Sequence, residues 1–316
     1  MAAFSSATNA WLSTLINKFA LEEVRTKTWE NPFARFKKGN MPLGYHAGFH
    51  HANPAALSDY TRPSAPNYTD PFAGADPVVF SDYLKVEADK IGSTIISDDY
   101  LADAMTSWEK LDEFVQTIIG TLYTANAEWE YNTMVTNLAY PWNNGNPVDM
   151  PYMTAVDCAL PTNEATAQAA ILALAGASMD MERIGSSHIG SNVRTTVKTF
   201  TDKANQILIS TDEFKLATEI YAKSVAFHVN YLDMLPEWLT VKSFGTYGAQ
   251  VGGRKIHAIL IDEARFQWRD KLFRIESMRN PADGVTNYWL RRRALIGNIN
   301  FANGEAFVEP AAAAEA

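Results

Sequence analysis

The sequence predicts an α+β protein, because two helical segments precede a run of strands near the carboxyl end. Between residues 107 and 140, apolar residues recur every three or four positions, which predicts one helix of about 50 Å. From residue 256 onward, β-branched and aromatic runs alternate with turn residues, which predicts strands. Hydrophobic residues make up 47% of the 316 positions, so the chain can bury a sizeable core.

The first predicted element is an amphipathic helix at the amino terminus. It follows the cap candidates Ser5 and Ser6, and its apolar stripe consists of Trp11, Leu12, Leu15, Ile16 and Phe19. This segment has no basic amino-terminal region, and Ser and Thr interrupt its apolar run. We therefore expect neither a signal peptide nor a membrane span.

The next segment, residues 31–44, reads NPFARFKKGNMPLG. Its Pro and Gly residues exclude a long helix, and its three basic residues lie among two phenylalanines. It therefore predicts an anchored loop or short strand, in which burial of Phe33 and Phe36 fixes the backbone and places the charges of Arg35, Lys37 and Lys38.

A long extended region follows. Residues 39–77 are dense in Pro, Gly, Asn, Asp and Tyr and show no sustained period, and Val78–Ile96 predicts a returning pair of strands. The aromatic residues favour packing against another surface over a disordered linker. His46, His50 and His51 have the spacing of zinc ligands on a helix, but the Pro and Gly residues around them disfavour a helix, so packing within a loop is the favoured interpretation.

The long helix begins at a capping box formed by Thr106 and Glu109 and contains Gly120, where a bend is expected. We expect its stripe of Leu111, Phe114, Val115, Ile118 and Leu122 to pack against strands that include Ile256–Ile261. A second helix is predicted at Glu164–Met181, and a third opens at a capping box of Ser210 and Glu213 and runs toward His228. Strands are predicted at Gln206–Ile209, Leu239–Phe244, Ile256–Ile261, Lys271–Met278, Asn287–Ile296 and near Phe307.

Two patterns resemble parts of a nucleotide-hydrolysing site. The stretch Gly185–Ser191 has the glycine spacing of a phosphate-binding loop, and Asp262 and Glu263 end an apolar run as metal-binding carboxylates do. The required Lys is missing, however, and no apolar strand leads into Gly185, so a soluble NTP hydrolase is a weak alternative. Cys158 is the only cysteine; this excludes an internal disulfide, is consistent with a reducing compartment, and favours a small buried side chain over a nucleophile.

The net charge of the chain argues against non-specific binding of nucleic acid. The formal net charge is −9 and the isoelectric point about 5.2, so any contact with DNA must be local. A run of three arginines, Arg291, Arg292 and Arg293, follows Tyr288 and Trp289. Strand alternation would place Arg292 on the face opposite its two neighbours, and a salt-bridged surface at a subunit contact is favoured over a DNA site.

Three blocks of the sequence resemble the major capsid proteins of small podoviruses of Gram-positive hosts, the Salasmaviridae or Picovirinae-like phages. They are NPFARFKKGNMPLG; SDDYLADAMTSWEKLDEFVQTIIGTLYTANAEWEYN; and AILIDEARFQWRDKLFRIESMRNP followed by NYWLRRRALIGNINFANGEAFV. They occur in the order found in that family. The middle third of the chain is similar only in layout.

The resemblance implies a Hong Kong 97-like capsid fold, with an amino-terminal arm over 1–33, an extended loop over 34–97, a peripheral domain over 98–148 and 256–316 that carries a long spine helix, and an axial domain over 149–255. It implies a structural role with no enzymatic activity, cofactor or metal. Pentamers and hexamers of the subunit would form an icosahedral shell in the virion, assembled in the host cytoplasm with a scaffolding protein and a portal. The shell would hold double-stranded DNA by weak contacts, without a membrane.

Two further expectations follow from the resemblance. The segment at 31–44 would be a hinge from which the extended loop crosses a neighbouring subunit, with its basic residues facing Asp112, Glu113 and Glu128 of that subunit. The chain ends soon after its last predicted strand, so we expect no appended immunoglobulin-like domain. An encapsulin-like nanocompartment shell, which has the same fold, stays open as an alternative.

Overall fold

The structure, a computed structural model, describes residues 29, 31–41, 47–55, 77–84, 86–97, 108–139, 153–185, 188, 197–223, 235–245, 254–280 and 282–310. The chain divides into two compact units. The first contains residues 1–45, 86–134 and 268–296, and the second contains 46–85, 135–267 and 297–316. The division into arm, extended loop, peripheral domain and axial domain stays a prediction. The predicted amino-terminal helix lies outside the described residues.

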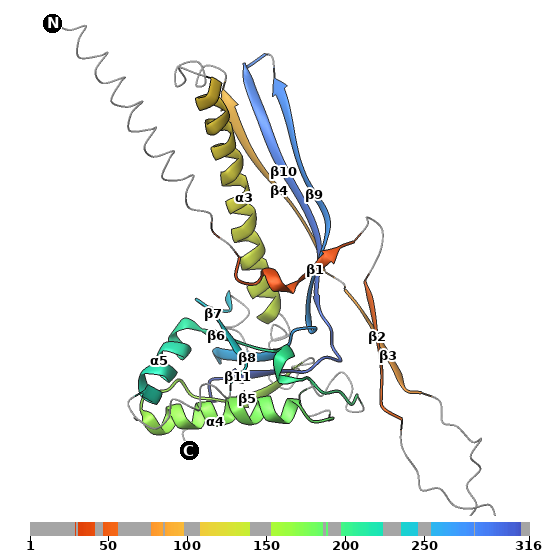
Figure 1. Ribbon diagram of the computed structural model, residues 1–316, viewed down its shortest axis with the longest axis vertical. Coiled ribbons are helices and arrows are strands. Elements are labelled where there is room, and N and C mark those ends of the chain that lie inside the picture. The colour runs from red at the N-terminus through yellow and green to blue at the C-terminus, as the bar shows by residue number, and fades with distance from the viewer. Residues whose placement is uncertain are drawn as a thin grey trace, which may run out of the picture. The chain divides into compact units, whose positions relative to one another are not determined.

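The first unit is built on a sheet of four strands with a long helix along it (Figure 1). The strand order is β1 (Lys37–Asn40), β9 (Phe266–Asn280), β10 (Val285–Asn298) and β4 (Val86–Ser97). β10 pairs antiparallel with the whole length of β4, whereas β1 joins the edge of β9 in parallel. The predicted strands over residues 271–278 and 287–296 are therefore confirmed, and both are longer than expected.

The helix α3 (Trp108–Ala139) has 32 residues and agrees closely with the predicted range. Its Leu122 is buried and faces Gly92 on β4, where an added Cβ would lie 3.7 Å from Cδ2 of Leu122. Its Tyr123 and Trp129 pack against Phe273 and Trp268 on β9. The contacts with β9 agree with the predicted packing of this helix against carboxyl-terminal strands. A contact of Leu122 with Ile256–Ile261, a segment of the other sheet, stays a prediction. That strand is apolar because it lies inside a different sheet, and the sequence does not reveal which sheet an apolar strand joins. The other four stripe residues have side chains outside the described set.

The second unit is built on a five-stranded mixed sheet. Its order is β5 (Thr154–Asp157), β11 (Gly304–Val308), β8 (Ile256–Asp262), β6 (Gln206–Thr211) and β7 (Glu237–Val241). β6 and β11 are buried at every position, and β8 at all but its last, so both faces of the three central strands are covered. A strand that is buried on both faces has a nearly continuous apolar sequence, as β8 has. The short strand β5 was not predicted.

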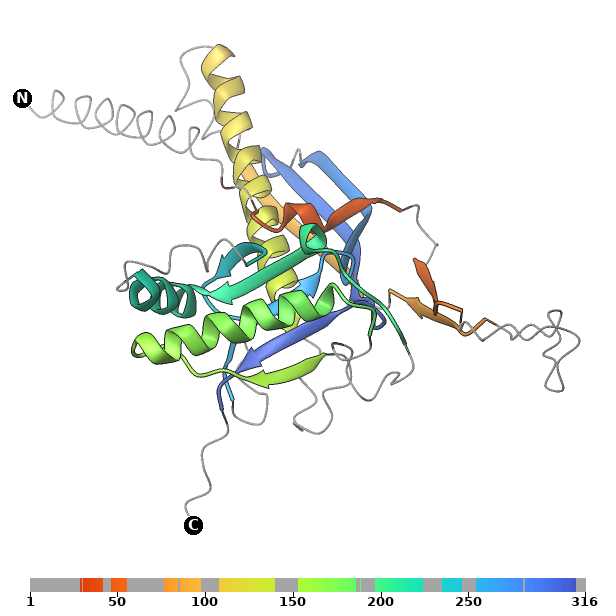
Figure 2. The ribbon, with the colours of Figure 1, turned by 60° about the horizontal axis from the view of Figure 1, so that its bottom comes forward.

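Two helices, α4 (Glu164–Met181) and α5 (Asp212–Lys223), lie on one face of this sheet (Figure 2). The core beneath them joins Leu174 and Phe214 of the helices to Leu208, Leu260 and Phe307 of the strands. Cys158 lies in the same cluster, and burial raises the pKa of its thiol to about 11. The thiol is therefore protonated at neutral pH, and the prediction that it is a buried small side chain is confirmed.

The predicted bounds of α4 are confirmed, and its start is fixed by a capping box in which Asn163 and Thr166 each accept from the other's backbone. The predicted cap of α5 is wrong. Thr211 Oγ1 accepts from the backbone N–H of Phe214, whereas Ser210 is a buried strand residue that accepts from Trp238 Nε1. The hydroxyl one residue later is the one that faces the free N–H groups of the helix. The prolongation toward His228 lies outside the described residues.

A separate hairpin in the second unit pairs β2 (Gly48–Ala52) with β3 (Val79–Tyr83). The predicted returning strands are thus present, but they pair with different partners: β3 with β2, and β4 with β10. None of the helices in the described ranges has an apolar stretch that would span a bilayer.

Candidate functional site

The root of the extended segment is held by two phenylalanines. Phe33 and Phe36 are 0% exposed, and their rings stack with centroids 5.9 Å apart. Phe33 also stacks on Tyr131 of α3 at 5.5 Å. The predicted burial of Phe33 and Phe36 is therefore confirmed, and it ties the root to the long helix.

The local backbone explains why these residues turn inward. Asn31 Oδ1 accepts from the backbone N–H of Phe33 at 2.9 Å, which starts a turn that continues as the short 3-10 helix η1 (Ala34–Phe36). The chain then enters β1, whose Gly39 has a φ of +93°, a value that other residues rarely adopt. The predicted short strand is thus confirmed as an edge strand beside β9.

A buried network of charges lies beside this root. Glu130 of α3 forms ion pairs with Lys37 of β1 and with Arg292 of β10, the latter at 2.7 Å. Arg292 forms a second pair with Asp270 of β9 at 2.7 Å, and its guanidinium lies over the ring of Phe273 at 4.9 Å. Two cations and two carboxylates therefore balance, as burial of charge requires. The network links the root to the helix and to two strands.

Within its own chain Lys37 pairs with a carboxylate, and its contact with a neighbouring subunit stays a prediction. The partner is Glu130, two residues beyond the predicted Glu128, because only Glu130 points toward the sheet. Glu128 is exposed, as predicted from its helical register, and Arg35 and Lys38 are half-exposed. The side chains of Asp112 and Glu113 lie outside the described set.

The arginine cluster on β10 alternates as predicted. Arg291 is exposed, Arg292 is buried and Arg293 is half-exposed. Both outer arginines share Asp89 of β4, at 3.3 Å from Arg291 and 3.9 Å from Arg293. Their charge is thus partly neutralised within the chain.

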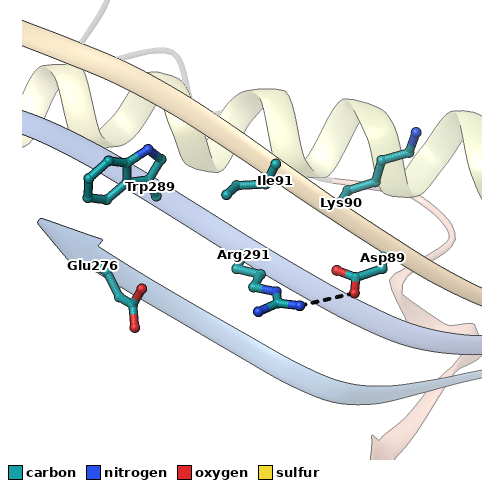
Figure 3. Close-up of a pocket in the computed structure, with 6 residues that line it drawn as sticks. All are labelled: Asp89, Lys90, Ile91, Glu276, Trp289 and Arg291. Atoms are coloured by element: carbon teal, nitrogen blue, oxygen red, sulfur yellow. Dashed lines mark hydrogen bonds and ion pairs between the residues drawn. The ribbon is translucent and has the colours of Figure 1, made fainter.

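Arg291 also lines a groove of about 450 Å³ on the sheet of the first unit (Figure 3). Ile91 in this groove is 67% exposed, whereas its neighbour Gly92 lies toward Leu122 of α3. Because side chains alternate along a strand, the groove lies on the sheet face opposite α3. Its lining residues are Asp89, Lys90, Ile91, Glu276, Trp289 and Arg291.

Of the residues considered for a hydrolase, His188 and Asp262 are engaged in structural contacts, whereas residues 186, 187 and 189–191 lie outside the described residues. His188, within the stretch that has phosphate-loop spacing, lies between Asp180 and Glu305. Asp262 accepts from Thr201 Oγ1 at 2.7 Å and from the backbone N–H of Ala264 at 2.7 Å, so it closes the turn after β8. The structure thus gives Asp262 a turn-capping role.

The histidines considered as zinc ligands also lie apart. His50 Nδ1 is 2.8 Å from Ser81 Oγ, while His51 Nε2 is 3.0 Å from the carbonyl of Lys198 and its ring stacks on Phe301. Adjacent residues of β2 point to opposite faces, which separates the two rings. His46 lies outside the described residues. Over the described part of the chain, no three His, Cys, Asp or Glu residues are placed to hold a metal.

Known proteins resemble this chain along most of its length. The sequence pattern of the Phi29-like phage major capsid proteins matches residues 1–308. The major capsid protein of Bacillus phage GA-1 is 25% identical over 96% of this chain and 61% of its own length, and that of Bacillus phage PZA is 25% identical over 95% and 63%. The chain thus spans about three fifths of the length of these relatives.

Solved capsids show the same fold at low sequence identity. The capsid structure of Staphylococcus phage Andhra aligns with a TM-score of 0.64 over 91% of this chain and 86% of that chain, at 9% identity. The mature capsid of bacteriophage PhiM1 aligns with a TM-score of 0.59 over 91% and 89%, also at 9% identity. The α+β fold is therefore of the Hong Kong 97 capsid type. With the match over residues 1–308, the chain belongs to the family of Phi29-like phage major capsid proteins, structural components of the phage virion.

Proposed function

We propose that copies of this chain assemble as pentamers and hexamers into an icosahedral shell that encloses phage double-stranded DNA. The observation that carries the proposal is the family match over residues 1–308. The charge of −9 supports it, because a container must let DNA move during packaging instead of gripping its phosphates. A scaffolding protein and a portal are the further partners that we propose.

We propose that the root of the extended segment is a contact between subunits. Arg35, Lys37 and Lys38 are half-exposed, Lys37 is paired with Glu130, and Glu128 is an exposed carboxylate on α3. Asp112 and Glu113 are further candidates on the same helix. Exposed ion pairs each contribute only about 0 to 1 kcal/mol, but a closed shell repeats every contact many times, so weak pairs select which neighbours fit.

Arg291 and Arg293 are proposed to face either the packaged DNA or a neighbouring subunit. Replacing both with Gln leaves Asp89 on an exposed edge, so the subunit should still fold. If the two arginines face DNA, shells should assemble and their retention of DNA should become less sensitive to salt. Loss of assembly from a folded double variant would instead mark them as an interface between subunits.

Electron microscopy of the purified protein tests the proposed function. We expect shells, and in infected cells shells filled with nucleic acid and bearing tails. Shells loaded with an enzyme would favour an encapsulin-like nanocompartment. Size-exclusion chromatography distinguishes both kinds of shell from a soluble NTP hydrolase. A small species that turns over ATP would overturn the proposal, whereas particles of megadalton size would exclude the hydrolase.

A further inference from the structure

His188 is held by two carboxylates in the second unit. Its Nδ1 lies 2.8 Å from Glu305 Oε2 on β11, and its Nε2 lies 3.0 Å from Asp180 Oδ2 near the end of α4. The ring is 7% exposed and Glu305 is 5% exposed, while Asp180 remains about half-exposed. One side chain therefore connects a helix end to a central strand.

The two contacts of His188 indicate the protonation state of its imidazole ring. A neutral imidazole has one N–H donor and one acceptor, so it can donate to only one of the two carboxylates. The other nitrogen would then face an oxygen lone pair at about 3 Å, which is repulsive. Only the imidazolium, with two N–H donors and a positive charge, satisfies both contacts and compensates the buried charge of Glu305.

The backbone around the ring is fixed on both sides. The N–H of Gly304, next to Glu305, donates to the carbonyl of His188 at 3.0 Å. The N–H of Thr201 donates to the carbonyl of Met181 at 2.7 Å, and a two-way bridge joins Gly185 to Thr199. Loosening the ring from its carboxylates would therefore act on the backbone contact at Gly304.

Two other charged side chains of the described residues lie near this cluster. From the segment after α4, Arg183 lies 4.0 Å from Asp180. From the turn before β9, the buried Arg265 lies beside Gly304. Burial alone lowers the pKa of His188, but the hydrogen bonds and charges of Glu305 and Asp180 outweigh it and raise that pKa above 6.5.

We propose that His188, Asp180 and Glu305 form a proton-operated clamp that fastens the end of α4 to β11 and loosens as the pH rises. The sign follows from the raised pKa of His188. The stabilisation is complete below 6.5, the ordinary pKa of the unfolded state, and is lost as the pH rises through the folded value. The inference does not depend on the proposed shell, because every group in it belongs to one chain.

Hydrogen–deuterium exchange of the full chain tests the clamp. We measure the protection of the Gly304 amide, corrected for base catalysis, from below pH 6.5 to well above it. In the unmodified protein we expect protection to fall through one transition above pH 6.5. In Asp180→Asn, which keeps the side-chain shape at an exposed site, the transition should move to lower pH. In His188→Gln, it should disappear.

The amide of Ile259 on β8 is the reference, because it lies inside the same sheet and its strand partners are Ile209 and Ala306, neither of which belongs to the clamp. Protection at Gly304 that does not depend on pH, or a transition that neither variant changes, would overturn the proposal. So would a loss of protection at Ile259 over the same pH range, because that would indicate unfolding of the whole sheet. If His188→Gln does not fold, the Asp180→Asn shift decides alone.

Discussion

Arg292 Nη2 lies 2.7 Å from Glu130 Oε1, and both side chains are almost completely buried. Arg292 extends from β10 and Glu130 from α3, so the pair joins the long helix to the centre of its sheet. Asn126, one turn before Glu130, donates to the same carboxylate at 3.0 Å. A buried ion pair thus lies between helix and sheet, where most proteins have a contact between apolar side chains.

Replacing Arg292 with Met should destabilise the first unit strongly. Among the described residues, the variant leaves the buried Glu130 with Lys37 alone as counter-charge, and it removes one partner of Asp270. Breaking a buried pair from one side costs about 3–5 kcal/mol. Chemical denaturation of the subunit measures this loss in the free energy of unfolding.

Arg291→Met is the matched control, because Arg291 is the next residue on the same strand and its pair with Asp89 is exposed. Its cost should be about 0 to 1 kcal/mol. Equal losses in the two variants would show that burial of Arg292 contributes nothing.

Regular elements with strong periodicity were predictable from the sequence. The bounds of α4 agree at both ends and those of α3 to within one residue, because helical spacing of apolar residues defines them locally. The predicted capping box of Thr106 and Glu109 lies outside the described set. The alternation of Arg291, Arg292 and Arg293 followed from strand geometry alone. These features need no knowledge of distant residues.

Pairing between distant segments was not predictable. Val78–Ile96 was expected to form one strand pair, yet β3 pairs with β2 and β4 pairs with β10, since nothing in a strand's own pattern names its partner. The role of Glu130 was also missed. It lies four residues before the buried Met134 and eight after the buried Leu122, so a carboxylate within the buried stripe was the available signal. Its charged partners Lys37 and Arg292, however, come from two strands that are distant in the sequence.

Gly304→Ala should destabilise the second unit. A Cβ at this position would lie 2.8 Å from Cδ and Nε of Arg265 and 2.9 Å from Sδ of Met153. Arg265 is fully buried and donates to the carbonyl of Ala302, so it has little room to move. We expect a loss of about 1–3 kcal/mol, as for other overpacked sites.

The control is Gly176→Ala, in the middle of α4, where a Cβ would meet no atom within 4 Å. This variant should raise the free energy of unfolding by about 0.5–1 kcal/mol, because Ala restricts the unfolded chain and favours the helix. Thermal unfolding of both variants gives the comparison. A neutral Gly304→Ala variant would contradict the tight packing at β11.

His257 should make the second unit sensitive to acid. It is 2% exposed on β8 and stacks on Phe214 at 5.7 Å, and neither ring nitrogen has a hydrogen-bond partner among the described residues. Burial, followed by the charge of Lys255, lowers the pKa of His257 below 6.5. The unfolded chain therefore binds a proton before the folded chain does, so stability is complete above pH 6.5 and falls as the pH drops toward the lowered value.

His257→Phe keeps a flat ring against Phe214 and removes the titrating group. The difference in unfolding free energy between the variant and the unmodified protein should be constant above pH 6.5 and should change below it in favour of the variant. Denaturation at a series of pH values measures that difference. A difference that is the same on both sides of pH 6.5 would count against the neutral, buried state of His257.

The basic residues at the root of the extended segment should separate folding from assembly. Lys37→Glu would place a carboxylate beside the buried Glu130, so we expect a destabilised or unfolded subunit. Arg35→Glu with Lys38→Glu reverses the other two half-exposed charges instead, and Phe33 and Phe36 still anchor the backbone. This double variant should fold but fail to form closed shells, because a small loss at each repeated contact accumulates over the assembly.

Circular dichroism and electron microscopy on the same sample distinguish the two effects. Normal shells from the double variant would refute the contact between subunits at this root, and an unfolded double variant would show that Arg35 and Lys38, like Lys37, serve the fold of their own chain.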